Sequence, residues 1–156
     1  MLLQPKNPAE SSVQKTEVVF PNDTNPMGML QGGRLIEWMD IAAAVCAQLH
    51  AGNISVTAAI YDVAFFHPAT VGDIISIEAN ITRAFNTSME IYVQAKGRKV
   101  KNDQFRKVGE AFLLFVAIDD HAQPVPVPPV IPQSSEEQLL YDMALDRKNR
   151  RAHAPK

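Results

Sequence analysis

The stretch RLIEWMDIAAAVCAQLH, residues 34–50, contains the strongest structural signal in the chain. Placed at about 100° per residue, the angular step of an α-helix, its apolar side chains share one broad face, and neither Gly nor Pro interrupts them. The three alanines at 42–44 keep part of this face thin, so that another element can approach closely. We therefore predict a long and largely buried helix over 34–50. Its apolar face contains Leu35, Ile36, Trp38, Met39, Ala42, Ala43, Val45, Cys46 and Leu49.

Segments with strand character follow this helix. Residues 73–83 and 88–96 alternate between apolar and polar side chains, which is typical of an antiparallel sheet with one face in solvent. Residues 55–67 are rich in β-branched and aromatic side chains, and the second half of 105–118 is apolar on both faces, which favours a central strand. A short strand is expected at 18–20, before the helix. Strands this long cover so apolar a helix only if they curl around it, and the pattern therefore predicts an α+β domain.

The length of the chain and its prolines indicate one domain with two flanking segments. A chain of 156 residues has the size of a single ordinary domain. A C-terminal helix is predicted to begin near Ser135, where Ser135 and Gln138 match a capping box. The expected division is a flexible lead-in over 1–15, one folded domain over 16–123, a proline-rich linker over 124–133 and a C-terminal helix and tail over 134–156.

The composition excludes several classes of function. The net charge of −2 argues against binding of nucleic acid or of an anionic membrane by the whole chain, since both favour a basic surplus. The single cysteine, Cys46, permits no disulfide within the chain, and the four scattered histidines form no pair at metal-ligand spacing, so we expect no metal site. Neither a signal peptide nor an apolar run of the roughly 18 residues needed to cross a membrane is found. We therefore expect a soluble, cytoplasmic protein without membrane insertion.

Two adjacent glycines, Gly32 and Gly33, lead directly into the predicted helix. The start of a helix leaves backbone N–H groups unpaired and carries a partial positive charge, and glycine lets a ligand come close to that backbone. Such a place suits a carbonyl oxygen that becomes an oxyanion. An ordinary tight turn into the helix also uses glycine, so the pair alone leaves both interpretations open.

Asp40 is the sharper chemical signal, because it lies in the interior of the helix, where aspartate has a poor propensity. Its neighbours along the helix surface are Ile36, Ala43, Ala44 and Ala47, with no Lys or Arg one turn away. A carboxylate in these surroundings is partly desolvated, which makes it a better base. The alternative is a solvated surface aspartate.

Two further features have candidate roles in binding. Asn25 lies in a constrained Thr-Asn-Pro turn, where it either offers a polar amide to a ligand or only closes an Asx turn. The segment between Lys96 and Lys107 contains six cations opposed only by Asp103. This hairpin either binds phosphate groups or is simply solvated at its tip.

A series of short motifs runs through the chain in a fixed order: Asp23-Thr24-Asn25, Gly28, Gly32-Gly33, Trp38-Met39-Asp40, Val56-Thr57, Phe66-His67-Pro68, Val71-Gly72-Asp73, Thr87-Ser88-Met89 and Phe115-Val116-Ala117. Together they resemble the ACOT-type hotdog acyl-CoA thioesterases, a family that includes the YciA-like acyl-CoA hydrolases. The resemblance runs from about Phe20 to Pro128. One departure is Gln31, which stands where an aromatic side chain is frequent in this family.

The resemblance implies a hotdog fold, in which a curved antiparallel sheet wraps around a long central helix. It also implies homodimers that assemble as trimers of dimers, a homohexamer, with active sites at the dimer interface. Asp40 matches the family's catalytic acidic residue, Asn25 matches its catalytic asparagine, contributed by the other protomer, and the Gly33 N–H would polarise the thioester carbonyl. The substrate contacts implied in the same way are Gly32, Thr57, Phe66, Thr87, Ser88, Arg98 and Lys99.

The function that the resemblance implies is hydrolysis of acyl-CoA to a free carboxylic acid and coenzyme A, a reaction of fatty acid metabolism. No cofactor is expected, since coenzyme A is itself part of the substrate. Two alternatives share the fold. A hotdog enoyl-CoA hydratase or dehydratase normally needs a histidine paired with a carboxylate, and no such pair is evident beside Asp40. A non-catalytic acyl-CoA-binding protein would bind the substrate without releasing thiol.

Overall fold

The computed structural model describes residues 3–153. Two short 3₁₀ turns, Pro8–Glu10 and Pro21–Asp23, accompany the main elements. No helix in the described part is both long and apolar enough to cross a membrane. In chain order, the main elements are β1 (Val13–Val18), α1 (Gly32–Ala51), β2 (Ser55–Phe65), β3 (Ile74–Ala84), β4 (Ser88–Arg98), β5 (Arg106–Ala117) and α2 (Ser135–Ala152).

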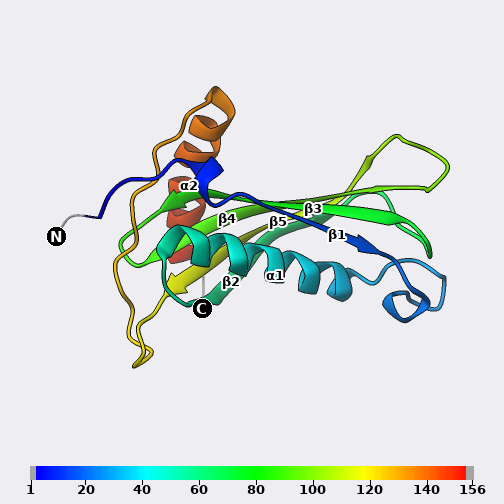
Figure 1. Cartoon of the computed structure of the whole chain (residues 1–156), viewed down its shortest axis with the longest axis horizontal. Helices are drawn as coiled ribbons and strands as arrows, with labels where there is room; N and C mark the ends of the chain where they lie inside the picture. Colours follow the sequence, from blue (N-terminus) through cyan, green and yellow to red (C-terminus); the bar gives the residue numbers. More distant parts are fainter. Residues whose placement is uncertain (1–2, 154–156) are drawn as a thin grey trace.

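The five strands form one antiparallel sheet in the order β1-β3-β4-β5-β2. The sheet curves along the length of α1, which lies against one of its faces (Figure 1). The structure thus has the curved sheet and long central helix of the hotdog fold, and the predicted fold class is confirmed. β5 lies between β4 and β2, as its apolar second half indicates.

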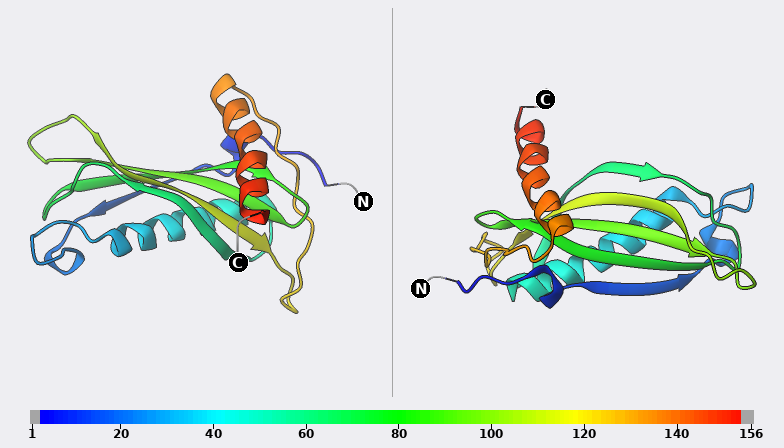
Figure 2. Two further views of the ribbon diagram at one scale, coloured as in Figure 1. Left: turned by 180° about the vertical axis from the view of Figure 1, so that it is seen from behind. Right: turned by 90° about the horizontal axis from the view of Figure 1, so that it is seen from above.

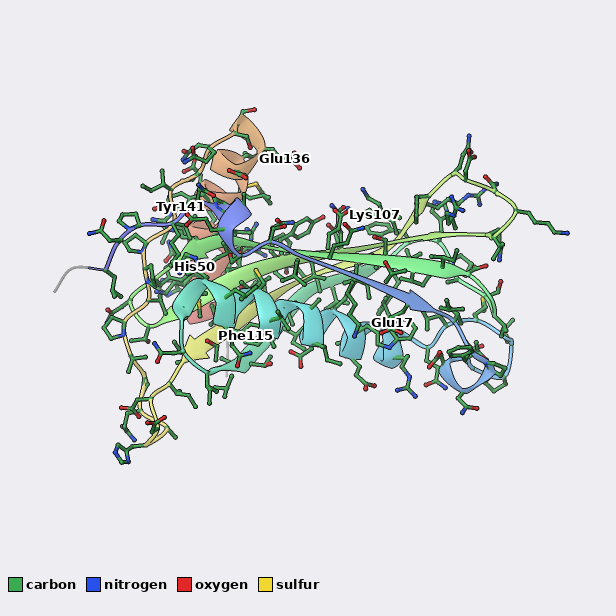
Figure 3. The ribbon with its side chains drawn as sticks, viewed as in Figure 1. Glu17, His50, Lys107, Phe115, Glu136 and Tyr141 are labelled. Atoms are coloured by element: carbon green, nitrogen blue, oxygen red, sulfur yellow. The ribbon has the colours of Figure 1, made fainter. Side chains whose placement is uncertain are left out.

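The core lies between α1 and the concave face of the sheet. The alternation of β3 and β4 is confirmed, because their apolar residues face the helix and are buried. Phe115 of β5 is fully buried (Figure 3). On the helix, Ala42, Ala43 and Ala47 are at most 1% exposed, so small side chains let α1 approach the sheet closely. Together with them, the helix buries Leu35, Trp38, Met39, Cys46 and His50.

The predicted apolar face of the helix is only partly covered. Val45 and Leu49 are 41% and 54% exposed, and Ile41 beside them is 44% exposed. A single sheet covers one side of a helix, and α1 is apolar over a wider arc than that side. The prediction that Val45 and Leu49 lie in the core is therefore wrong.

Two local predictions are shifted in the structure. The first strand begins at Val13 and not at 18, and so includes residues assigned to the lead-in 1–15. It was missed because β1 is an edge strand of mostly polar residues, which lacks an apolar pattern. In α2, Ser134 and not Ser135 is the N-cap, and its hydroxyl accepts a hydrogen bond from the Glu137 N–H at 3.1 Å.

The N-terminal segment, the end of α1 and the proline-rich segment gather at one end of the sheet. Lys6 pairs through its backbone with Pro129 and Ile131 of the proline-rich segment. The fully buried His50, near the end of α1 (Figure 3), lies with Nε2 2.7 Å from the Pro128 carbonyl. Burial lowers the pKa of His50, so the ring is neutral and its Nε2–H donates to that carbonyl.

A buried ion pair fixes α2 to the convex face of the sheet, which α2 crosses near one end (Figure 2). Arg147 donates to Glu90 of β4 from Nε at 2.9 Å and from Nη2 at 2.7 Å, and the two side chains are only 5% and 0% exposed. The hydroxyls of Tyr61 and Thr82 also donate to Glu90, each at 2.7 Å. The carboxylate is thus fully satisfied, as a buried charge requires.

We expect Arg147→Ala to lower the free energy of unfolding by about 3–5 kcal/mol, because it leaves the Glu90 carboxylate buried without its partner. Arg150→Ala, on the same helix, removes an exposed ion pair with Asp62 and should cost less than about 1 kcal/mol. Denaturant unfolding of both variants measures the difference. Equal losses would contradict the assigned role of Arg147.

We expect Cys46 to be inert towards thiol reagents in the folded protein. The side chain is fully buried and burial raises the pKa of the thiol to about 12, so almost no thiolate forms at about pH 8. An aromatic disulfide reagent should label the protein only after guanidinium is added. Rapid labelling of the folded protein would contradict this.

Candidate active site

The start of α1 presents free backbone amides. Gln31 is the N-cap and its carbonyl accepts from the Leu35 N–H at 3.1 Å, but no side chain caps this end. Among residues 3–153, the N–H groups of Gly32 and Gly33 have no hydrogen-bond partner. A side chain added at Gly33 would meet nothing within 4 Å, whereas one at Gly32 would meet the Phe65 ring at 3.0 Å. Space is therefore open on the side-chain side of Gly33, whereas Gly32 packs against Phe65.

Asn25 lies in the loop that precedes this helix. Its Oδ1 accepts from the backbone N–H groups of Met27 at 2.9 Å and Met29 at 3.1 Å, so the side chain does form the Asx turn that the sequence allows. The side-chain nitrogen has no partner within the described residues. Asn25 is thus held by its oxygen while its N–H₂ group stays available as a donor.

An apolar pocket of about 410 Å³ adjoins the helix start. It brings together three residues predicted from the sequence, Asn25, Gly32 and Phe66. Its further lining includes Leu35, Phe65, His67 and Val108, which the sequence did not single out as site residues. An extended, mostly apolar ligand fits such a lining, with Asn25 and His67 as the polar side chains.

Asp40 lies elsewhere on the helix, beside Thr57 of β2. The Thr57 hydroxyl donates to Asp40 Oδ1 at 2.7 Å, and in the described part of the chain Asp40 has no other hydrogen bond and no ion pair. Asp40 is partly buried and Thr57 is exposed. A β-bulge follows Thr57 directly, where the pairing of β2 with β5 shifts register. The predicted catalytic residue is therefore an uncompensated carboxylate, oriented by one hydroxyl.

One chain does not bring the two parts of the candidate site together. Gly33 and Asp40 are seven positions apart on the same helix, which corresponds to about 10 Å along its axis. A thioester carbonyl bound at the Gly33 N–H would therefore be out of reach of Asp40 of the same chain. Each chain has one half of a site at the helix start and the other half at the middle of the helix.

The basic hairpin lies at the end of the molecule that also holds the Asn25 loop (Figure 1). Arg98, Lys99 and Arg106 line a second pocket of about 150 Å³, which shares His67 and Val108 with the apolar pocket. Lys99 is paired with Asp73 at 2.9 Å, while Arg98 and Arg106 form no ion pair among residues 3–153. The structure thus places a cationic pocket next to the apolar one.

Thr87 and Ser88, also predicted to contact substrate, lie far from this pocket. Ser88 begins β4 and Arg98 ends it, so about 33 Å of extended strand separates them. The Thr87 carbonyl accepts from the Ala117 N–H at the end of β5, near α2. Within one chain, these two residues share no site with Arg98 and Lys99.

Comparison with known proteins identifies relatives of the whole chain. A family model described as the thioesterase superfamily matches residues 27–101. An uncharacterized acyl-CoA thioester hydrolase of Bacillus subtilis is 36% identical over 149 residues, which cover 93% of this chain and 87% of the relative. An apo-hexameric acyl-CoA thioesterase of known structure is 37% identical, with a TM-score of 0.93 over 98% of this chain and 100% of that chain.

A third relative is informative about the site. The acyl-CoA hydrolase of Staphylococcus aureus, solved as an asparagine-to-alanine variant in complex with coenzyme A, is 37% identical, with a TM-score of 0.91 over 96% of this chain and 90% of that chain. Further structures of the same hydrolase contain an aspartate-to-alanine and a threonine-to-alanine variant. The intervals between those three positions equal the intervals between Asn25, Asp40 and Thr57. This chain belongs to the acyl-CoA thioester hydrolase family of the thioesterase superfamily.

Proposed function

We propose that this chain hydrolyses acyl-CoA to a carboxylic acid and coenzyme A, with Asp40 as the catalytic residue. The proposal rests mainly on the surroundings of the Asp40 carboxylate. It is partly buried in the middle of the central helix, has no cationic partner within residues 3–153, and accepts one hydrogen bond, from Thr57. Oδ2 is therefore left to act on the reacting groups.

Two routes lead from this carboxylate to the products. As a general base, Asp40 takes a proton from a water molecule whose oxygen attacks the thioester carbon. As a nucleophile, Asp40 itself attacks that carbon, and water then hydrolyses the resulting anhydride. In both routes the C–S bond breaks and coenzyme A leaves as a thiolate. A thiolate is a good leaving group, so the reaction needs no strong general acid.

Thr57 has a more specific role than the substrate contact that the resemblance implies. Its hydroxyl proton is directed at Asp40 Oδ1, so we assign it as the residue that fixes the rotamer of the carboxylate. The β-bulge after Thr57 distorts the edge strand at this position. The matching intervals in the S. aureus hydrolase support a grouping of Asn25, Asp40 and Thr57.

The proposed active site forms between two copies of the chain. Asp40 and Thr57 of one protomer would face Asn25 and the Gly33 N–H of its partner, because one chain holds these groups about 10 Å apart. The surface around Asp40 supports this arrangement. β2 is an edge strand, which pairs with β5 on one side only within residues 3–153. Exposed apolar side chains lie on β2 and on the neighbouring part of α1. They are Val56, Ile60 and Val63 of β2 and Ile41, Val45 and Leu49 of α1.

Coenzyme A would then occupy the two adjoining pockets of the protomer that provides Asn25. The phosphates suit Arg98 and Arg106, whose guanidinium groups match the geometry of phosphate oxygens, and the Lys99 ammonium lies in the same pocket. The apolar pocket beside Phe66 leads from there to Gly32 at the start of α1, next to Gly33 in the chain. Thr87 and Ser88 could take part only from another protomer, given their position at the far end of β4.

We propose a homodimer as the functional unit and a hexamer as its assembly. The proposal of a hexamer is supported by the relative that was solved as an apo-hexameric acyl-CoA thioesterase. The proposed reaction uses no metal and no cofactor. The cytoplasm as compartment and the link to fatty acid metabolism stay predictions.

Asp40→Asn should lower kcat for thiol release from acyl-CoA by about 10²–10⁴-fold, because an amide is neither a base nor a nucleophile. A panel of short to long acyl-CoA substrates identifies the substrate range of the unaltered protein. Asp120→Asn, which changes an exposed aspartate distant in sequence, is the matched control and should keep full activity. Full activity of Asp40→Asn would refute the assignment. Crotonyl-CoA hydration in the same panel tests the hydratase alternative.

Ile60→Lys should separate the proposed dimer and remove most of the activity, by roughly tenfold or more, because it places a charge in an apolar contact between copies. Light scattering coupled to gel filtration measures the mass, and thiol release measures the activity. Leu139→Lys, on α2 and 59% exposed, introduces the same charge on the other side of the sheet and should leave the dimer intact. A fully active monomer would show that one chain suffices for the site.

A further inference from the structure

α1 begins without the side-chain cap that helices normally have. Gln31 occupies the N-cap position, with φ −66° and ψ 137°. A Ser, Thr, Asp or Asn at this position places an oxygen on the N–H of the second or third helical residue, which here are Gly33 and Arg34. The Gln31 side chain is turned away from the helix instead, and its Nε2 donates to the Thr24 carbonyl at 3.0 Å.

The other helix of the chain provides the contrast. At the start of α2, Ser134 accepts from the Glu137 N–H at 3.1 Å, which is the conventional arrangement. α2 has three residues with polar or acidic side chains in its first turn, whereas α1 begins with two glycines. The missing cap is therefore a property of α1 and not of the chain in general.

The two glycines add to this unfavourable start. Glycine disfavours a helix relative to alanine, and neither Gly32 nor Gly33 has the positive φ that would require it. Gly32 is explained by the Phe65 ring, which leaves no room for a side chain, but a side chain at Gly33 would meet nothing within 4 Å. Sequence choices that weaken local structure without a packing reason concentrate at functional sites.

Gln31 also connects the helix start to the loop that holds Asn25. Its backbone N–H donates to the Asp23 carbonyl at 2.9 Å, and its side chain donates to the carbonyl of Thr24. Both acceptors directly precede Asn25. Asp23 in turn binds Arg34 in the first turn of α1, at 3.1 Å. The same residue therefore leaves the helix amides free and ties the Asn25 loop beside them.

We propose that Gln31 is a positioning residue for thioester hydrolysis, which keeps the Gly33 N–H uncapped for the substrate oxygen while it holds Asn25 next to it. This inference rests on the proposed function, in which the Gly33 N–H stabilises the oxyanion. A capping side chain at position 31 would stabilise the folded protein and slow the reaction. The two effects come from one hydrogen bond, which must break before the amide can bind the oxyanion.

The test compares Gln31→Ser with Gln31→Ala. Both variants lose the hydrogen bond to Thr24 and differ only in a hydroxyl that can cap the helix. We expect the melting temperature of Gln31→Ser to exceed that of Gln31→Ala by about 2–4 °C. We expect kcat of Gln31→Ser for acyl-CoA hydrolysis to be about fivefold lower than that of Gln31→Ala, with KM little changed.

A purely structural Gln31 would give a different result, because both variants lose the same contact and would lose the same activity. Equal kcat values, or equal melting temperatures, would overturn the proposal. The unaltered protein and Asp40→Asn are measured in the same series. If the unaltered protein releases no thiol, the proposed function itself is refuted. If the activity depends on Asp40 but is equal in the two Gln31 variants, only this inference is refuted.

Discussion

The packing of α1 against a single curved sheet is the constraint on which the rest of the structure depends. The helix is apolar over more of its circumference than one sheet covers. The alanines at 42, 43 and 47 bring the helix axis close to the strands, so that five strands suffice for a continuous core. The part of the apolar surface that the sheet leaves uncovered runs beside β2, and Asp40 lies within it.

This arrangement explains why the candidate chemistry is divided along the helix. The free amides are a property of the first turn, and the aspartate needs the partly covered surface in the middle. A rigid helix keeps the two at a fixed separation within one chain, and so favours a site built from two copies. Under the proposed function, the uncovered apolar surface is both the interface between two copies and the surroundings of Asp40.

The sequence predicts the fold well where periodicity is strong. The helix over 34–50 and the strands over 73–83 and 88–96 are observed within two residues of their expected ends. The bounds of β1 are not predicted correctly. β1 is an edge strand with polar residues such as Lys15 and Glu17, so its sequence lacks the apolar alternation that marks the other strands. The exposure of Val45 and Leu49 is also not predicted, since a helical wheel shows which side chains are apolar but not how much of the helix other elements cover.

The candidate site is less predictable for a physical reason. Asn25, Gly32 and Phe66 line one pocket in the structure, although their motifs do not predict that they lie together. The contact of Thr57 with Asp40 lies beside a β-bulge that leaves no clear mark in the sequence. The roles of His67 and Arg106 as pocket residues depend on which strand ends lie side by side. Thr87 and Ser88 were grouped with Arg98 by motif, although the length of β4 separates them.

The buried ion pair between Glu90 and Arg147 lies at one end of the molecule, which should therefore open less readily than the other end. Near α2, that pair and the bonded N-terminal and proline-rich segments tie several strands together. At the opposite end, the residues at the tip of the basic hairpin are exposed, and those of the Asn25 loop are exposed or partly buried. Backbone amides near α2 are therefore expected to exchange their hydrogens through rarer openings than those of the loop and hairpin. Under the proposed function, the nucleotide of the substrate would then enter and leave by local opening at this end, while the opposite end keeps the strands in register.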